Sequence, residues 1–323
     1  MSKSVLLKSS IAKKYWMAFT GLFLCLFLVG HLLGNLQLFM HGEEGKRAFN
    51  EYAYFMQHNP FIKIMSYVTY LSILFHAIDG FMLAMQNKKA RPINYAYNKP
   101  SANSSSASRN MAVLGTAILI FIVTHMVNFW AKMHFDHMPL HTIVKNEQRG
   151  VPNPMNGQPQ MMPFQVTYLL TTKGEYLEQY AYYEKEKLYV SFNGAAIAAV
   201  DTAVAKVNPY RIEHETMLHN KNSKLKVAEG YKDLHSTTYA FFGHDRTKDG
   251  IKTNPYALVA VIGYVLSMLV LAFHLNHGFA SAFQSLGMRH PRYTKGIKMF
   301  GMLFSYLIPL AFAAIPVYIY LTK

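Results

Sequence analysis

The chain has 323 residues, of which 51% are hydrophobic, 14% aromatic and only 15% charged, and its formal net charge is +15. This composition excludes an intrinsically disordered chain and differs from that of an ordinary soluble domain, in which about a quarter of the residues are charged. A single cysteine, Cys25, excludes a disulfide framework, a thiolate zinc site and a self-contained iron–sulfur cluster. Any metal or redox chemistry of the chain therefore depends on its fifteen histidines.

Five apolar segments are long enough to cross the hydrocarbon core of a bilayer, which takes about 20 helical residues. They span residues 15–40, 61–86, 111–133, 256–282 and 297–321. The last contains Pro309 and Pro316, which a membrane helix tolerates because nearby groups satisfy the freed carbonyls. The predicted fold class is an all-α integral membrane protein in which five transmembrane helices form a bundle.

Basic residues gather in three connections that contain no acid: the N-terminal tail, the loop after the second segment and the loop after the fourth. In a five-helix arrangement these connections share one side of the membrane, and enrichment in Lys and Arg is typical of the cytoplasmic side. The residues are Lys3, Lys8, Lys13, Lys14, Lys88, Lys89, Arg91, Lys99, Arg109, Arg289, Arg292, Lys295 and Lys298. We therefore expect a cytoplasmic N-terminus and no nucleic-acid partner, because the net charge is explained by topology.

The chain divides into three predicted parts. Residues 1–133 hold the first three transmembrane helices and residues 254–323 hold the last two. Between them, residues 134–253 are too polar to span a membrane and too long for a plain loop. We predict that they form an extracytoplasmic insertion of mixed structure.

Short sequence patterns predict the local structure of the insertion. Two runs rich in β-branched and aromatic residues, 164–172 and 188–192, predict strands. The small-residue stretch 194–207 predicts a helix, since it is too short and too charged to span a membrane.

Four histidines lie deep in the apolar segments, where ionisable groups are expensive to bury and usually functional. His31 and His125 lie about 21 to 24 Å from the cytoplasmic ends of their helices, whereas His76 and His274 lie about 12 to 15 Å from theirs. Any single one is explained equally well by an interhelical hydrogen bond. Two pairs at two depths, each drawn from two helices, are what bis-histidine haem ligation in a bundle requires.

Two alternatives at these positions are less favoured. Zinc fits poorly because a two-histidine site lacks the third and fourth ligands that zinc takes. His277 competes with His274 in the fourth segment, since it lies three residues further along and about 60° round the helix. The resemblance described next, and not the helix geometry, favours His274.

Four stretches of the sequence resemble one family, the five-helix dihaem cytochrome b membrane anchor of succinate:quinone oxidoreductases, in the single-subunit form found with Bacteroidetes-type enzymes. The stretches are GHLLGNLQLF at 30–39, LFHAIDGFML at 74–83, THMVNFW at 124–130 and AFHLNHGFASAFQSLG at 272–287. Together with helix order and loop charges, the resemblance covers about two thirds of the chain. It does not extend to residues 141–230, which leaves open an added partner, a stabilising cap or altered access for a quinone.

The resemblance implies two haem b groups. His31 and His125 would ligate the distal haem, and His76 and His274 the proximal one. It further implies a bacterial cytoplasmic (inner) membrane location, with a flavoprotein subunit carrying FAD and an iron–sulfur subunit on the cytoplasmic face. This chain would be the membrane subunit of respiratory complex II, a tricarboxylic acid cycle enzyme, passing electrons to a membrane quinone, menaquinone by expectation. The direction, succinate oxidation or fumarate reduction, stays open.

Four further residues are candidates for supporting roles. Glu51, before the second segment, is a proton-transfer candidate beside a quinone, with a solvated loop acid as the plainer interpretation. Asp79, one turn from His76, is a candidate hydrogen-bond partner near the proximal haem or between helices. Lys14 and Arg289 are candidates for contacts with haem propionates.

Two other classes of function compete with this one. A dihaem cytochrome b of another quinone-linked oxidoreductase, such as a formate or nitrate enzyme, would bind the same haems and a different partner. A transporter or structural membrane protein would use the histidines only to bond helices and would be colourless. The absence of inverted repeats and of paired broken helices in the sequence counts against a transporter.

Overall fold

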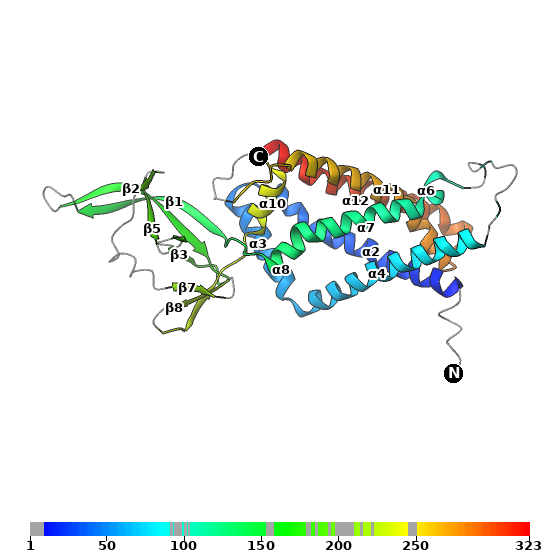
Figure 1. The fold of residues 1–323 in the computed structure, drawn as a ribbon, viewed down its shortest axis with the longest axis horizontal. Helices are drawn as coiled ribbons and strands as arrows, with labels where there is room; N and C mark the ends of the chain where they lie inside the picture. Colours follow the sequence, from blue (N-terminus) through cyan, green and yellow to red (C-terminus); the bar gives the residue numbers. More distant parts are fainter. Residues whose placement is uncertain are drawn as a thin grey trace. The chain divides into compact units, whose positions relative to one another are not determined.

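A computed structural model gives the fold of the chain (Figure 1). It describes residues 10–90, 93, 99, 102, 104–152, 158–178, 182–184, 187–192, 195–197, 210–213, 216–220, 223–244 and 251–323. Lys3, Lys8 and Arg91, which contribute to the predicted topology, lie outside the described residues, as does most of the predicted helix at 194–207.

The chain forms two compact units. The first contains the described residues of Met1–Met40, Phe55–His134 and Ser236–Lys323, and the second contains those of His41–Tyr54 and Phe135–His235. This division differs from the predicted boundaries at 133 and 253, because residues 41–54 group with the second unit and the described residues of 236–253 group with the first.

Long helices build the first unit. They are α2 (Ser10–Asn35), extended by the 3-10 turn η1 (Leu36–Phe39); α4 (Pro60–Lys89); α7 (Met111–His125), continued by the π-helical segment η2 (Met126–Ala131) and by α8 (Lys132–Phe135); α11 (Ala257–Ser285); and α12 (Pro291–Thr322). The short helices α6 (Ser106–Arg109) and α10 (Leu234–Phe242) lie between them in the chain.

The prediction of five long apolar helices is confirmed. Within the described residues, five helices are long and apolar enough to cross a membrane: Ile11–Phe39, Pro60–Lys89, Met111–Phe135, Ala257–Ser285 and Pro291–Thr322. Few of their side chains are buried inside the protein, and none in α7 is, as expected of helices whose outer faces contact lipid. The chain therefore has the helices of a multi-pass membrane protein.

Local chemistry sets where the long helices begin. The Asn59 side chain accepts hydrogen bonds from the backbone N–H groups of Phe61 and Ile62, and Pro60 occupies the first helical position of α4.

Helix α12 continues through both of its internal prolines, Pro309 and Pro316, which are buried.

Helices α11 and α2 connect the long helices of the first unit. Helix α11 packs against α12, α2 and α7, and α2 packs against α4, α11 and α12. Cys25 of α2 and Leu275 and Phe279 of α11 form a buried apolar cluster between these helices. Because α11 touches three of the other long helices, side chains along its length reach groups on several of them.

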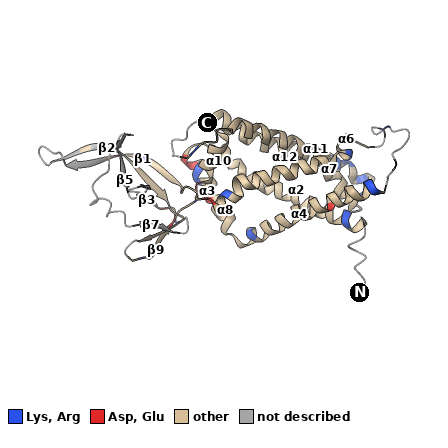
Figure 2. Cartoon of the chain, in the orientation of Figure 1, with Lys and Arg blue, Asp and Glu red and all other residues tan. Residues whose placement is uncertain are grey.

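Charge is distributed along the first unit as the sequence predicts. Figure 2 shows the long helices almost entirely free of charged residues between their ends, with Lys and Arg gathered where α2 begins, where α4 ends and near α6. A similar basic stretch of the sequence joins α11 to α12.

Among its described residues, the second unit combines the start of α3 (Gly42–His58) with nine strands. Three antiparallel sheets have the strand orders β1-β2-β3, β4-β5-β6 and β7-β8-β9. The strands are β1 (Thr142–Pro152), β2 (Pro159–Leu170), β3 (Tyr176–Glu178), β4 (Tyr182–Glu184), β5 (Lys187–Phe192), β6 (Ala195–Ile197), β7 (Tyr210–Glu213), β8 (Met217–Asn220) and β9 (Lys226–Glu229).

The two predicted strands of the insertion are confirmed, and the predicted helix is wrong at its start. Strand β2 covers most of 164–172 and β5 covers 188–192. Ala195–Ile197 forms strand β6, which pairs with β5 through Val190↔Ile197. Small residues have weak preferences of their own, so pairing with the neighbouring strand decides the local structure there.

Candidate functional site

Two histidine pairs lie among the long helices of the first unit. In the α2/α7 pair, the ring centres of His31 and His125 are 5.9 Å apart and the rings are inclined at 86°. In the α4/α11 pair, the ring centres of His76 and His274 are 6.1 Å apart with an angle of 65°. The structure thus brings together the same partners that the depth calculation grouped.

Aromatic rings surround the α2/α7 pair. Phe27 stacks on His31 with ring centres 5.3 Å apart, and Phe312 of α12 lies 5.6 Å from the same ring. Phe121 and Phe129 lie 5.7 and 5.3 Å from His125, one on each side of it along the helix. These rings give the pair an apolar setting that favours neutral imidazoles.

A tyrosine contacts one nitrogen of this pair. The hydroxyl of Tyr264, on α11, lies 3.3 Å from Nδ1 of His125. Whichever of the two groups donates, this contact occupies Nδ1 and leaves Nε2 for another partner.

A threonine performs the same role in the α4/α11 pair. The Thr20 hydroxyl donates to the backbone oxygen of Trp16 at 3.0 Å, and its oxygen lies 3.3 Å from Nδ1 of His76. The backbone oxygen of Met17, at 3.2 Å, is a second acceptor for the same hydroxyl. While the hydroxyl donates to either carbonyl, its oxygen is left to accept from an Nδ1–H of His76. That tautomer leaves the lone pair on Nε2 of His76 available to a metal ion.

Glycines let neighbouring helices approach the α4/α11 pair. A Cβ atom at Gly21 of α2 would lie only 3.2 Å from Cε1 of His76, and one at Gly115 of α7 would lie 3.7 Å from Cε1 of His274. The closeness at Gly21 means that a larger residue there would push the His76 ring out of place.

His274 holds a buried polar atom without a protein partner. Within the described residues, its Nδ1 is shielded from solvent and makes no hydrogen bond. A buried polar group without a partner is costly, so such an atom indicates either a ligand or a strained site.

The spacing within each pair fits a metal ion placed between two imidazoles. With metal–nitrogen bonds of about 2 Å and ring centres about 1 Å beyond each nitrogen, the ring centres would lie about 6 Å apart. The observed distances of 5.9 and 6.1 Å match this separation. Two metal–nitrogen bonds along one axis would fix the distance between the ring centres. Each imidazole could still rotate about that axis, so the angle between the ring planes is not fixed.

Each pair offers two ligands and no more. Throughout the part of the chain that the structure describes, no group of three or more His, Cys, Asp or Glu side chains is placed to hold a metal ion. A tetrahedral zinc site takes four ligands, usually from at least three side chains, so these pairs do not form one.

Glu51 lies on a helix and has a partner. Its Oε1 is 2.6 Å from Nε of Arg47, one turn earlier on α3, and both side chains are partly exposed. Glu51 is therefore a helical residue and not a loop acid, and it belongs to the second unit.

The other supporting candidates are not joined to the histidine pairs by any hydrogen bond. Asp79 is partly buried on α4, one turn from His76, and has no hydrogen-bond partner among the described residues. Lys14 is exposed in the second turn of α2. Arg289 is exposed just beyond α11 and lines a pocket together with His277.

Sequence reasoning missed Thr20 and Tyr264, the two side chains that hold the histidine Nδ1 atoms. Each is a polar residue within an apolar segment, where a polar side chain is expected to form a hydrogen bond with a neighbouring helix. That signal marks both as candidates, but it does not reveal which histidine each one faces.

Neither a protein-family model nor any curated protein or solved structure gives a significant match to this chain. The resemblance to the succinate:quinone oxidoreductase anchor therefore stays a prediction, and the function is argued from the site itself.

Proposed function

We propose that this chain is the cytochrome b membrane-anchor subunit of a succinate:quinone oxidoreductase and holds two haem b groups. The observation that carries the proposal is the arrangement of four histidines from four helices in two pairs, with ring centres 5.9 and 6.1 Å apart. These distances are the ones expected when an iron lies between two imidazoles.

The number of protein ligands favours haem over a bare metal ion. Each pair supplies two imidazoles whose ring centres are about 6 Å apart, so the other ligands of a metal ion would have to come from the bound group. A porphyrin brings four nitrogens of its own and would need only two ligands from the protein. Neutral histidines in apolar surroundings supply such ligands.

The residues around each pair would orient the ligands. Thr20 would hold Nδ1 of His76 and Tyr264 would hold Nδ1 of His125, which would leave the Nε2 atoms to ligate the iron. Bound haems would supply one-electron transfer between a soluble partner subunit and a membrane quinone, which we propose to be menaquinone.

The basic stretches support one face as the docking side for partners. Lys and Arg concentrate where α2 begins, where α4 ends and between α11 and α12 (Figure 2), and such enrichment marks cytoplasmic loops. We propose a bacterial cytoplasmic membrane location with a cytoplasmic N-terminus. Flavoprotein and iron–sulfur subunits, carrying FAD and the clusters, would bind this face.

The first test is a dithionite-reduced minus oxidised optical spectrum of the chain purified from haem-replete membranes, with a pyridine haemochrome count. We expect about two haems b per chain and reduction by succinate when the partner subunits co-purify. A colourless protein would refute haem binding and leave the histidines as helix-bonding groups. Two haems with a different partner, one that oxidises formate or reduces nitrate, would keep the cytochrome and refute the succinate assignment.

Histidine variants test the pairing. Replacing His76 or His274 with alanine should remove one spectral component, and replacing His31 or His125 should remove the other. His277→Ala is the matched control on α11, and it should keep both components because His277 lies outside both pairs. Loss of a single component by both His76→Ala and His31→Ala would overturn the pairing.

A further inference from the structure

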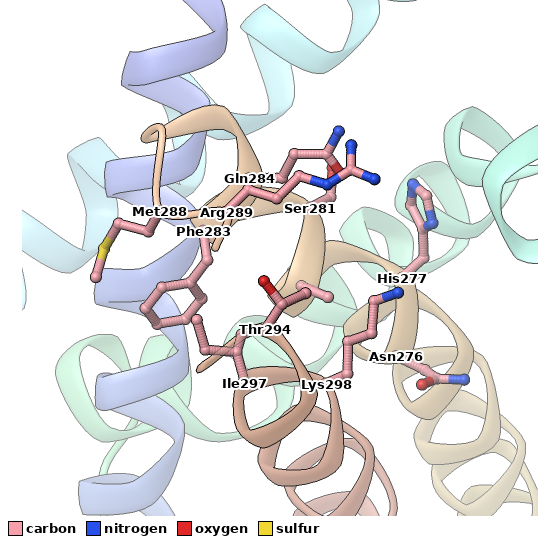
Figure 3. Close-up of a pocket in the computed structure, with 11 residues that line it drawn as sticks. Asn276, His277, Ser281, Phe283, Gln284, Met288, Arg289, Thr294, Ile297 and Lys298 are labelled. Carbon is pink, nitrogen blue, oxygen red and sulfur yellow. The ribbon is translucent and has the colours of Figure 1, made fainter. Parts of the chain in front are cut away.

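A pocket with both polar and apolar lining residues lies where α11 ends and α12 begins. Figure 3 shows the side chains that line it. Its volume is about 200 Å³, several times the roughly 30 Å³ that one water molecule occupies in the liquid. The residues that line it are Asn276, His277, Ala280, Ser281, Phe283, Gln284, Met288, Arg289, Thr294, Ile297 and Lys298.

The turn that shapes the pocket is fixed by backbone chemistry. Gly287 has a φ of 78°, a conformation that glycine adopts without strain. The N–H of Met288 donates to the carbonyl of Phe283, and the N–H of Gly287 donates to that of Gln284, which together make a Schellman motif. The turn therefore fixes the backbone from which the exposed Arg289 side chain reaches the pocket.

The start of α12 is fixed in the same way. Nδ1 of His290 accepts from the backbone N–H of Arg292, and the Thr294 hydroxyl donates to the backbone oxygen of His290 at 2.7 Å. Both walls of the pocket thus belong to ordered helix ends.

The pocket carries positive charge without an acid to balance it. Arg289 and Lys298 line it from opposite sides of the turn, and none of the described lining residues is acidic. The sequence has no Asp or Glu from Gly250 to its last residue. An anion bound in the pocket would be attracted to both side chains, which are exposed.

Neutral donors and an apolar wall complete the lining. Figure 3 shows Gln284 and Ser281 near Arg289, with His277 near Lys298, so several N–H and O–H groups surround the same space as the two cations. Phe283 and Ile297 form the apolar side and pack against the buried Cys25 cluster. A ligand with a negative head and an apolar tail matches both sides of the pocket.

We propose that this pocket binds the phosphate of an anionic phospholipid, with the lipid chains against the apolar wall. Basic pockets between transmembrane helices near the membrane surface suit such headgroups, and an Arg fork can hold two phosphate oxygens at once. The inference uses only residues of this pocket and does not depend on haem binding.

The test measures lipid retained by the full chain, purified in detergent and reconstituted with equal amounts of phosphatidylglycerol and phosphatidylcholine. We expect the protein to retain phosphatidylglycerol selectively after re-extraction and washing, as measured by lipid phosphorus and mass spectrometry. The double variant R289Q/K298Q should lose this selectivity at least tenfold. The double variant R292Q/K295Q, which removes two charges from the same stretch outside the pocket, should stay within twofold of the unmodified chain.

A third variant, Ser281→Leu, fills the pocket without changing charge and should also lose the selectivity. Equal losses in both double variants would assign the effect to general surface charge and overturn the proposal. So would unchanged retention in R289Q/K298Q, or displacement of the lipid by millimolar inorganic phosphate, which would identify a free-phosphate site. If R289Q/K298Q kept its lipid and lost haem b or the binding of a partner subunit, the pocket would serve a propionate or an acidic protein segment instead.

Discussion

The ammonium group of Lys46 lies 2.9 Å from the carboxylate of Asp233, and the two side chains are only 7% and 3% exposed. Lys46 also donates to the backbone oxygen of Thr142, and Asn50 donates to the second oxygen of Asp233. The Asn50 side chain accepts in turn from the backbone N–H of His235. This network joins α3 to both ends of the strand region within the second unit.

Removing one member of this ion pair should destabilise the second unit strongly. Lys46→Met leaves the Asp233 carboxylate buried without its counter-charge, which is expected to cost about 3 to 5 kcal/mol. Hydrogen exchange of the β1 and β2 amides measures this loss as a fall in the free energy of opening.

The matched control is the next residue of the same helix. Arg47→Met removes a cation from the half-exposed pair with Glu51, and such surface pairs contribute between zero and about 1 kcal/mol. An equal fall in the free energy of opening in Lys46→Met and Arg47→Met would contradict the claim that a buried ion pair matters more than an exposed one.

His235 should make the second unit less stable in mild acid. Burial lowers the pKa of His235 to about 4 from its ordinary value of 6.5, although the nearby Asp233 carboxylate acts in the opposite direction. The unfolded chain therefore binds a proton in a range where the folded chain does not. The stability is complete above pH 6.5 and falls toward pH 4, with a loss of about 2 kcal/mol at pH 5 from this group.

Thermal unfolding of the second unit at pH 7.5 and pH 5.0, in the unmodified chain and in His235→Gln, isolates this contribution. The variant should show a smaller fall in unfolding temperature between the two pH values. An identical fall in both proteins would assign the acid sensitivity to other groups.

Enlarging Gly21 should disturb the α4/α11 histidine pair alone. The first atom of a new side chain would lie 3.2 Å from His76, so Gly21→Leu should displace the imidazole and reduce the spectral component of that pair by at least half. Gly263→Ala on α11 is the control, because a Cβ there meets no atom within 4 Å. Loss of the His31 component instead would show that Gly21 acts through the fold of the bundle.

The Nδ1 partners should tune one pair each. Thr20→Val removes the acceptor from His76 and keeps the side-chain shape, and loss of such an orienting bond typically weakens metal-site affinity about 10 to 100-fold. Tyr264→Phe should do the same for His125. Haem transfer to apomyoglobin, followed separately for the two spectral components, should speed up for a different component in each variant.

The long helices were predictable because each presents apolar side chains over the thickness of the hydrocarbon core of a bilayer, and that thickness sets the length of the apolar run. Segments read from hydropathy alone agree with the five long apolar helical spans to within about four residues, except that the last span begins at Pro291 and not at residue 297. The histidine partners were predictable from helix rise alone, since depth in a bundle follows residue number.

Other parts of the structure depend on contacts that local patterns do not encode. Lys46 is polar and reads as a surface residue, yet it is buried because Asp233, 187 positions later, pairs with it. Helix α3 was missed for the same reason, since its mean hydropathy is low and its stability comes from distant partners. The contact between Thr20 and His76 likewise depends on how each helix is rotated about its axis, which hydropathy and residue spacing do not determine.

Helix α11 has a consequence for the spacing of the two histidine pairs. It provides His274 to one pair and Tyr264 to the other, so the rise over ten residues, about 15 Å, separates its two points of contact. A single continuous helix thus fixes the distance between the two histidine pairs. Changes in loop length elsewhere leave that distance intact, whereas inserting one residue between Tyr264 and His274 would rotate one contact by about 100° and break it.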